Sequence, residues 1–257
     1  MRLVKSPNRA IILAAGQGKR LLPLTESRPK CLVELSGRTL LAWQLVRLQA
    51  AGVQEAVVVT GFRADAVETE VARLGLTMPV RLAYNPFYSV ADNLASCWIV
   101  RAEFDRDVLL LNGDTLFGAG VAERLIGAPS AEITVTVDRK AAYDADDMKV
   151  LTENGRLRAI GKTIEAYDAE SIGFLRFSPV GAAKFAAGID KTLQRTEGLK
   201  RWYLSVIDEL ARSGVDVKVA SIEGLEWGEM DFPADVDNLT RLSRKWTEAA
   251  ATVHAAE

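Results

Sequence analysis

Residues 10–21 read AIILAAGQGKRL, an apolar run that leads directly into a glycine-rich segment. The apolar run predicts a buried β-strand, and Gly16 and Gly18 after it allow a tight turn that points backbone N–H groups at an anion. Arg20 and, further along, Lys30 add charges that can pair with phosphate oxygens. The stretch therefore predicts a phosphate-binding loop at the end of the first strand.

The glycine spacing alone leaves several interpretations open, because G-x-G after a strand also begins dinucleotide-binding folds and ordinary turns. A dehydrogenase is disfavoured by Leu21, which stands where a third glycine is needed. It is disfavoured again by Thr60-Gly61-Phe62, which follows the second predicted strand in place of an acidic ribose ligand. A Walker A loop needs a longer glycine spacing followed by Lys-Ser/Thr.

Strand-like and helix-like segments alternate through the first half of the chain. Apolar runs predict strands over 10–15, 56–60, 80–84 and 108–111, and apolar residues at helical spacing predict helices over 40–51, 64–74 and 93–102. From residue 131 the pattern changes to strict alternation, with a turn at Asn154-Gly155. These patterns predict an α/β fold with a mixed, mostly parallel central sheet, helices on its flanks and antiparallel additions in the second half.

Composition narrows the class of protein further. The chain has 257 residues, 49% of them hydrophobic, and a net charge of −2, which gives no reason to expect a nucleic-acid or stable membrane partner. A soluble cytoplasmic protein is expected, because the chain has only two cysteines and the apolar run 10–15 is too short for a signal peptide or a membrane span. We expect one domain over residues 1–246 and a flexible tail over 247–257. Cys31 and Cys97 are too few for a disulfide framework. The single histidine, His254, lies in an Ala-rich tail, which excludes a histidine base.

The whole stretch 12–32, with LAAGQGKRLLPLT and then RPKCL, resembles the signature of the sugar-phosphate nucleotidyltransferase family. The resemblance implies a Rossmann-like nucleotidyltransferase fold in which Arg20 and Lys30 are catalytic, with Lys30 between the donor α-phosphate and the acceptor phosphate. It also implies a set of nucleotide contacts. These are Leu13, Ala14, Ala15, Gly16, Gly18, Asn85, Asn93, Ser96 and Gly113.

Two further segments end in acidic residues that can hold a metal ion. Residues 109–114 read LLLNGD, and the carboxyl end of a parallel strand is where ligands of α/β folds collect. Residues 227–235 read WGEMDFPAD, and these segments resemble the two metal-binding segments of the family. The resemblance implies Mg²⁺ held by Asp114 and Asp231. Glu229 and Asp235 are not expected as ligands, and Asp235 is expected in the first turn of a helix.

The segment 85–98, NPFYSVADNLASCW, resembles the phosphocholine cytidylyltransferase branch of the family, from which Asp92 and Cys97 depart. The branch implies CTP as the donor. Tyr88, Trp202 and Trp227 can then form an aromatic cage for a quaternary ammonium group, although core packing is the more common role for any one of these rings. The acceptor contacts expected are Tyr88, Lys149, Lys162, Glu170, Trp202 and Trp227.

The expected function is therefore a Mg²⁺-dependent transfer of CMP from CTP to a small phosphorylated amino alcohol, with in-line release of pyrophosphate. Two alternative enzymes remain open: a sugar-1-phosphate nucleotidyltransferase using UTP, dTTP or CTP, and a cytidylyltransferase for a phosphonate. The alternative outside enzymes is a nucleotide-binding regulatory subunit. The sequence leaves the acceptor, the preferred base and the oligomeric state open, a homo-oligomer included.

Overall fold

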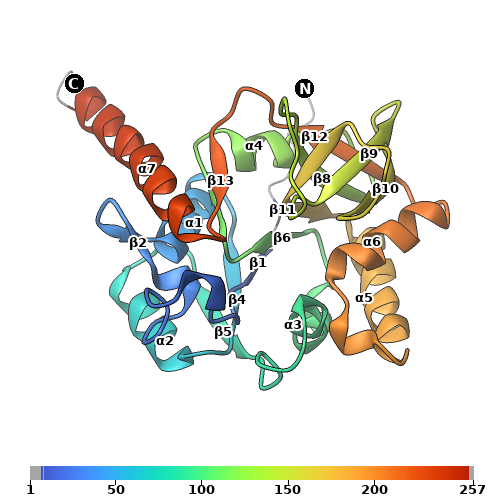
Figure 1. Ribbon diagram of the computed structural model, residues 1–257, viewed down its shortest axis with the longest axis horizontal. Helices are drawn as coiled ribbons and strands as arrows, with labels where there is room; N and C mark the ends of the chain where they lie inside the picture. The colour runs from blue at the N-terminus through green and yellow to red at the C-terminus, as the bar shows by residue number, and fades with distance from the viewer. Residues whose placement is uncertain (1–6, 8, 255–257) are drawn as a thin grey trace.

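The structure is a computed structural model that describes residue 7 and residues 9–254. Its first half forms four parallel strands in the order β5-β4-β1-β6 (Figure 1). The three helices predicted from apolar spacing, α1, α2 and α3, connect these parallel strands in chain order. The bounds are β1 (Arg9–Leu13), α1 (Leu40–Ala50), β4 (Glu55–Thr60), α2 (Ala64–Arg73), β5 (Val80–Tyr84), α3 (Asn93–Ile99) and β6 (Val108–Asn112).

The second half extends the same sheet with five more strands. β11 runs antiparallel beside β6, and the order continues β11-β8-β12-β10-β9, with β11 also paired to β9. β12 is parallel to β8, so this half is mixed and not purely antiparallel. The predicted α/β fold with a mixed sheet is confirmed. The bounds are β8 (Ile133–Asp138), β9 (Lys149–Glu153), β10 (Arg156–Gly161), β11 (Ala169–Phe177) and β12 (Val217–Ser221).

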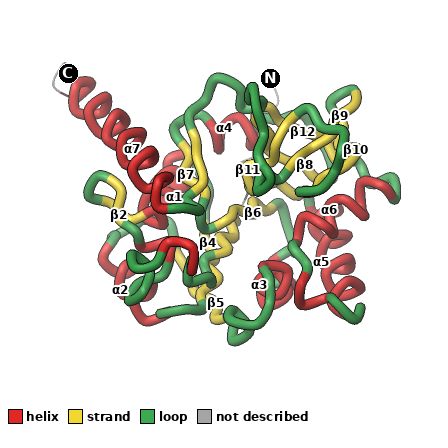
Figure 2. Tube along the Cα trace, viewed as in Figure 1, coloured by secondary structure: helices red, strands yellow, loops and turns green. Residues whose placement is uncertain are grey.

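Side chains of the parallel strands alternate between two hydrophobic layers, one on each face of the sheet. Ile11 packs with α3, α5 (Pro179–Leu193) and α6 (Tyr203–Arg212), whereas Ile12 packs with α1, α2 and α4 (Val121–Ile126). Helices therefore cover the strands on both sides (Figure 2). The carboxyl ends of the strands stay uncovered by these helices, which leaves that edge for a ligand.

The last helix, α7 (Pro233–His254), packs its first half on Leu21 and Trp43 through Leu239. Residues 247–254 of the predicted tail are helical, and residues 255–257 lie outside the described residues. Shorter elements complete the fold. They are β2 (Glu34–Leu35), β3 (Arg38–Thr39), β7 (Thr115–Phe117), β13 (Trp227–Glu229) and the 3-10 turns η1 (Lys19–Leu21), η2 (Lys30–Leu32), η3 (Arg101–Glu103) and η4 (Gly198–Lys200). Within the described part of the chain, no helix is both long and apolar enough to cross a membrane.

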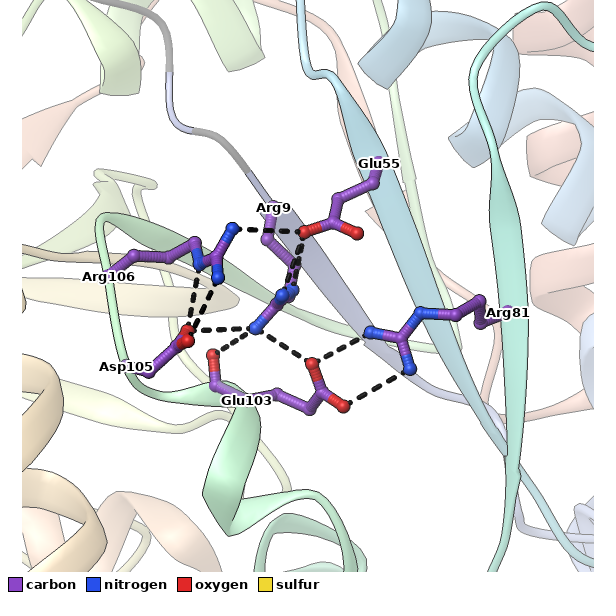
Figure 3. Close-up of polar contacts among 6 residues, drawn as sticks. All are labelled: Arg9, Glu55, Arg81, Glu103, Asp105 and Arg106. Carbon is purple, nitrogen blue, oxygen red and sulfur yellow. Dashed lines mark hydrogen bonds and ion pairs between the residues drawn. The ribbon is translucent and has the colours of Figure 1, made fainter.

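The amino ends of the parallel strands are joined by a cluster of charged side chains (Figure 3). Arg9, at the start of β1, has a side chain only 7% exposed and lies 2.8 Å from Glu55, 2.7 Å from Glu103 and 2.9 Å from Asp105. Two outer arginines bind the same acids, Arg81 at Glu103 and Arg106 at Asp105. This cluster links β1, β4 and β5 to the segment before β6, at the edge of the sheet opposite the glycine-rich loop.

Candidate active site

The glycine-rich loop leaves the carboxyl end of β1, and Gly18 gives it its shape. Gly18 adopts a left-handed conformation with a φ of 79°, which only glycine adopts at little cost. A Cβ atom at this position would lie 2.8 Å from Lys30 Cβ. The buried Thr25 hydroxyl fixes the loop by donating to the Gly18 carbonyl at 2.8 Å. The position of the Lys30 side chain therefore depends on a glycine at residue 18.

Lys30 joins two carboxylates that come from distant parts of the chain. Its Nζ lies 2.9 Å from Asp114 Oδ2 and 2.7 Å from Asp231 Oδ1. Burial acts to lower the pKa of Lys30, but the two carboxylates outweigh it and the pKa is raised. Burial acts to raise the pKa of Asp231, but Lys30 and then Arg20 outweigh it and the pKa is lowered. Lys30 therefore stays a cation at neutral pH and can act through its charge but not as a base.

Arg20 extends this charged array toward the second half of the sheet. Its guanidinium lies 3.0 Å from Asp231 Oδ1 and 3.2 Å from Asp146 Oδ2. On the other Asp146 oxygen, Lys162 Nζ lies at 3.3 Å, and this ammonium is 5.0 Å from the centre of the Trp202 ring. Arg20, Lys162 and Trp202 all line one cavity beside Lys30.

The turn that carries Asp114 is held by Gln44 of α1, a residue that the sequence patterns did not single out. Gln44 is 1% exposed, and its Nε2 donates to the carbonyls of Asn112 at 2.9 Å and Thr115 at 2.8 Å. The available signal was a glutamine three residues after Leu41, on the apolar face of the predicted helix. Such a buried amide needs polar partners, and here the partners are the backbone of the turn.

Asp231 reaches the site because β13 pairs with β7, next to the Asp114 turn. The Met230 N–H donates to the Asp114 carbonyl at 3.0 Å, which brings Asp231 beside Lys30. One Asp235 oxygen accepts from the N–H groups of Asp231 at 2.8 Å and Phe232 at 2.7 Å. Asp235 thus stabilises the start of α7, in line with its expected place in the first turn of a helix.

The two predicted metal ligands form a pair that fits a hard cation. Asp114 Oδ1 is buried and has no hydrogen-bond partner among the described residues, and Asp231 shares Lys30 with the other Asp114 oxygen. Mg²⁺ is typically held by one or two carboxylates, substrate phosphates and water. Over residues 9–254, no group of three or more His, Cys, Asp or Glu side chains could hold a metal. The chain thus offers two carboxylate ligands at this point.

All nine predicted nucleotide contacts line two adjoining cavities beside the loop. The smaller, of about 120 Å³, lies between the loop and Lys30, and the larger, of about 300 Å³, extends toward α3. Asn85 is buried, its Nδ2 donates to Ser96 Oγ at 3.0 Å, and its Oδ1 accepts from the Phe87 N–H at 2.8 Å. The nine are Leu13, Ala14, Ala15, Gly16, Gly18, Asn85, Asn93, Ser96 and Gly113.

The predicted acceptor contacts do not share one cavity. Tyr88 lines the nucleotide cavity, Trp202 lines the cavity with Lys162, and Trp227 lines a third cavity with Glu170. The three rings therefore line separate cavities in this structure, and the aromatic cage stays a prediction. The reason lies in the topology, because Tyr88 follows β5 at the sheet edge, whereas Trp227 Nε1 donates to Asp138 at the end of β8 at 2.7 Å.

Lys149 lines none of these cavities, so the structure does not place it with the other acceptor contacts. Its side chain is buried, and its Nζ donates to the backbone carbonyls of Asp144 and Lys162. Lys149 therefore fixes the connection between β8 and β9.

The third cavity, of about 330 Å³, is strongly acidic. Burial raises the pKa of Glu170 to about 7, against the opposing effect of Lys140, whose Nζ is 2.8 Å away. Burial, Asp114 and Asp231 raise the pKa of Glu229 well above its usual value. The carboxylates that line this cavity are Asp138, Asp144, Asp146, Asp147, Glu170, Glu229, Asp231 and Asp235.

A glycine-rich loop after the first strand, with a lysine and two carboxylates at the same sheet edge, is the arrangement of a nucleotidyltransferase. Residues 10–170 match the family model of the MobA-like NTP transferase domain. The chain therefore belongs to this family.

Two curated relatives and one solved structure narrow the type of transferase. The chain is 34% identical over 244 residues to a CMP-5'-(3-aminopropyl)phosphonate synthase of Streptomyces rubellomurinus, covering 89% of this chain but only 38% of that protein. It is 31% identical over 239 residues to a choline-phosphate cytidylyltransferase of Streptococcus pneumoniae, covering 91% and 97% of the two chains. The inositol-1-phosphate CTP transferase of T. maritima has the same fold, with a TM-score of 0.79 at 24% identity over 92% of this chain and 96% of that one. The domain is of the cytidylyltransferase type.

Proposed function

We propose that this protein transfers CMP from CTP to a small phosphate or phosphonate that carries an ammonium group, with pyrophosphate as the second product. One observation carries the proposal: the acidic cavity adjoins the cavity of Lys30, Arg20 and Lys162, and Glu229 and Asp231 line both. An acceptor with an anionic and a cationic end can then place each end against side chains of opposite charge. The names of the two curated relatives, an aminopropylphosphonate synthase and a choline-phosphate cytidylyltransferase, agree with such an acceptor.

A primary ammonium acceptor is our first candidate. A primary ammonium donates three hydrogen bonds, and carboxylates are its natural acceptors, whereas a quaternary ammonium needs aromatic faces. The acidic cavity has many carboxylates, and Tyr88 and Trp202 lie in other cavities. Phosphocholine is the second candidate, because Trp227 and Phe232 also line the acidic cavity and offer two aromatic faces.

The proposed reaction is a direct in-line transfer. An anionic oxygen of the acceptor phosphate or phosphonate attacks the α-phosphorus of CTP, a new P–O bond forms, and the bond to the β-phosphate oxygen breaks. Pyrophosphate leaves with the electron pair of that bond. The attacking oxygen is already ionised, so the reaction requires no general base. What it requires is the alignment of two anions that repel each other and the neutralisation of the charge that develops between them.

Lys30 and Arg20 supply the positive charge in this scheme. Lys30 lies between the nucleotide cavity and the acceptor side, and its raised pKa keeps it protonated. The N–H groups of the Gly16–Gly18 turn would hold the triphosphate, as glycine-rich turns at the end of a strand commonly do. Asp114 and Asp231 would hold Mg²⁺, which neutralises phosphate charge when bound.

The test is a pyrophosphate-release assay with Mg²⁺, each of the four nucleoside triphosphates and a panel of acceptors. The panel contains 3-aminopropylphosphonate, 2-aminoethylphosphonate, phosphoethanolamine, phosphocholine and glucose-1-phosphate. The expected result is turnover with CTP and at least one of the primary ammonium acceptors. Turnover with glucose-1-phosphate alone, or with no acceptor, contradicts the proposal, and a clear preference for phosphocholine replaces the first candidate by the second.

A further inference from the structure

Asn112, the last residue of β6, carries a side-chain amide that the fold leaves without a partner. Its Oδ1 is buried and unpaired, and neither end of the amide hydrogen-bonds to a described residue. The backbone carbonyl, by contrast, is engaged by Gln44. Buried side-chain oxygens in folded proteins are normally paired, so the unpaired Oδ1 of this half-buried amide at the end of a central strand calls for an explanation.

The neighbouring strand is shaped to make room for this amide. Gly173 of β11 has a φ of 68°, and a Cβ at this position would lie 2.2 Å from Asn112 Nδ2 and 2.6 Å from its Cγ. The ladder between β11 and β8 is also irregular here, with a register shift between Ser171 and Leu175. A left-handed glycine and a strand irregularity both weaken a sheet, and such irregularities are frequent beside active sites. Both features lie where β11 passes the Asn112 side chain.

The amide lies where the two substrates would meet. Asn112 lines both the nucleotide cavity beside α3 and the cavity that contains Lys30, Lys162 and Trp202. Asp114 also lines both cavities, but one of its oxygens is taken by Lys30. Asn93 is the other residue common to both, and its Oδ1 accepts from the Tyr203 N–H at 3.0 Å.

We propose that the Asn112 amide is a substrate-binding group, which donates a hydrogen bond to an oxygen of the acceptor phosphate or phosphonate and so orients that group toward the α-phosphorus of CTP. This inference rests on the proposed function. The cations of the site are already paired with carboxylates, Lys30 with Asp114 and Lys162 with Asp146. An uncharged donor can fix the direction of the attacking group without a further ion pair, and rotation of the amide can present its NH₂ to either cavity.

The experiment compares Asn112→Ala, Asn112→Asp and Gly173→Ala with the wild type, using the best acceptor of the panel. Both Asn112 variants should lower kcat/KM for the acceptor by roughly 10- to 100-fold, the order expected for the loss of one hydrogen bond to a charged oxygen. Asn112→Asp, which keeps the shape but places a negative charge near the phosphate, should be the worse of the two. The affinity for CTP with Mg²⁺, measured by calorimetry without acceptor, should stay within about threefold of the wild type.

Gly173→Ala should have the same kinetic effect, because the added methyl group displaces the Asn112 amide. Its matched control is Gly155→Ala. Gly155 has a φ of 74°, so alanine there strains the backbone in the same way, but its Cβ would meet no atom within 4 Å and would displace no side chain. Gly155→Ala should leave kcat/KM unchanged. The double variant Asn112→Ala/Gly173→Ala should be no slower than Gly173→Ala alone, because both changes remove the same hydrogen bond between the Asn112 amide and the acceptor.

Two readouts separate substrate binding from a structural role. Calorimetry of acceptor binding to the complex with a non-reactive α,β-methylene CTP analogue should show weaker binding in Asn112→Ala, while the melting temperature of that variant stays near the wild-type value. An unchanged kcat/KM in Asn112→Ala overturns the inference and leaves the proposed function intact. So does a double variant whose loss of kcat/KM equals the product of the losses in Asn112→Ala and Gly173→Ala. A wild-type protein that is silent with every acceptor overturns the proposed function and the inference with it.

Discussion

The Cα atom of Gly18 lies against the stem of Lys30, so that a methyl group at residue 18 would stand 2.8 Å from Lys30 Cβ and 2.9 Å from its Cδ. The conformational freedom of the loop and the position of its functional cation are therefore one structural property. Two glycines that sequence patterns assign to phosphate binding have separate roles here, since a Cβ at Gly16 would meet no atom within 4 Å.

Gly18→Ala should lower kcat by roughly 10- to 100-fold, because it displaces Lys30 from Asp114 and Asp231. Gly37→Ala is the control: Gly37 has a similar φ of 82°, and its Cβ would meet no atom within 4 Å. Steady-state kinetics and thermal melting of both variants check this prediction. Equal loss of activity in both would attribute the effect to backbone strain instead.

Lys30→Ala should lower kcat by roughly 100- to 1000-fold, with a change of only a few-fold in CTP affinity, because its charge acts mainly on the transition state. Lys30→Arg keeps the charge but replaces a compact ammonium by a planar fork, and it should recover part of the activity. Single-turnover kinetics together with calorimetric CTP binding measure the two effects. A variant that loses CTP affinity but keeps its turnover would assign Lys30 to nucleotide binding alone.

The proposed binding of Mg²⁺ by Asp114 and Asp231 can be tested without turnover. CTP with Mg²⁺ should raise the melting temperature of the wild type more than CTP with EDTA, because the two carboxylates would hold the metal, which would add to the free energy of CTP binding. Asp114→Asn and Asp231→Asn should each abolish this Mg²⁺-dependent increment. The same increment in both variants would place the metal elsewhere.

Glu170 should make stability depend on pH. Its pKa is raised to about 7 in the folded protein, so folding favours the protonated form, and its contribution falls as pH rises from the unfolded value near 4.5 through 7. Glu170→Gln stays neutral at every pH. The stability of the wild type relative to this variant should therefore decrease by about 1–2 kcal/mol between pH 4.5 and 8, after discounting for partial solvation. Denaturant titrations at several pH values measure this difference. If the free energy of unfolding of the wild type and of Glu170→Gln changes with pH in the same way, Glu170 is not the cause of the pH dependence.

Arg9→Met should destabilise the protein without changing catalysis. The substitution leaves Glu55, Glu103 and Asp105 without their shared central cation, at a cost of about 1–3 kcal/mol for a pair that is buried on one side only. The site lies at the other edge of the sheet, so kcat and KM at a temperature well below melting should match the wild type. Altered kinetics in the folded variant would show that the two edges are coupled.

Much of the fold could be predicted from the sequence, because each strand, helix and turn depends mainly on residues that are close together in the chain. The parallel strands, the crossover helices and the loop of Gly16 and Gly18 all follow from short-range apolar spacing and turn residues. Asp231 could be placed only through the family resemblance, since 201 residues separate it from Lys30. The sequence also could not show that Tyr88, Trp202 and Trp227 line separate cavities, because composition does not tell which of three rings, distant in the sequence, share a cavity.

Gln44 and Asn112 show that the partners of an amide side chain cannot be predicted from the sequence. Each is an amide in an apolar element, and only the tertiary structure shows that one supports a turn and the other stays unpaired. The role of Lys149 depends in the same way on two backbone carbonyls that approach it from Asp144 and Lys162.

Different segments of the chain supply the side chains of the proposed transfer site and those of the acidic cavity, which bears on how acceptor preference can change. The loop, Lys30 and the Asp114 turn come from the first half of the chain, whereas the acidic cavity is lined by residues 138–147, by Glu170 at the start of β11 and by residues 227–235. Under the proposed function, substitutions in the connection between β8 and β9 should change the acceptor preference while Lys30 and Asp114, which come from other segments, stay unchanged.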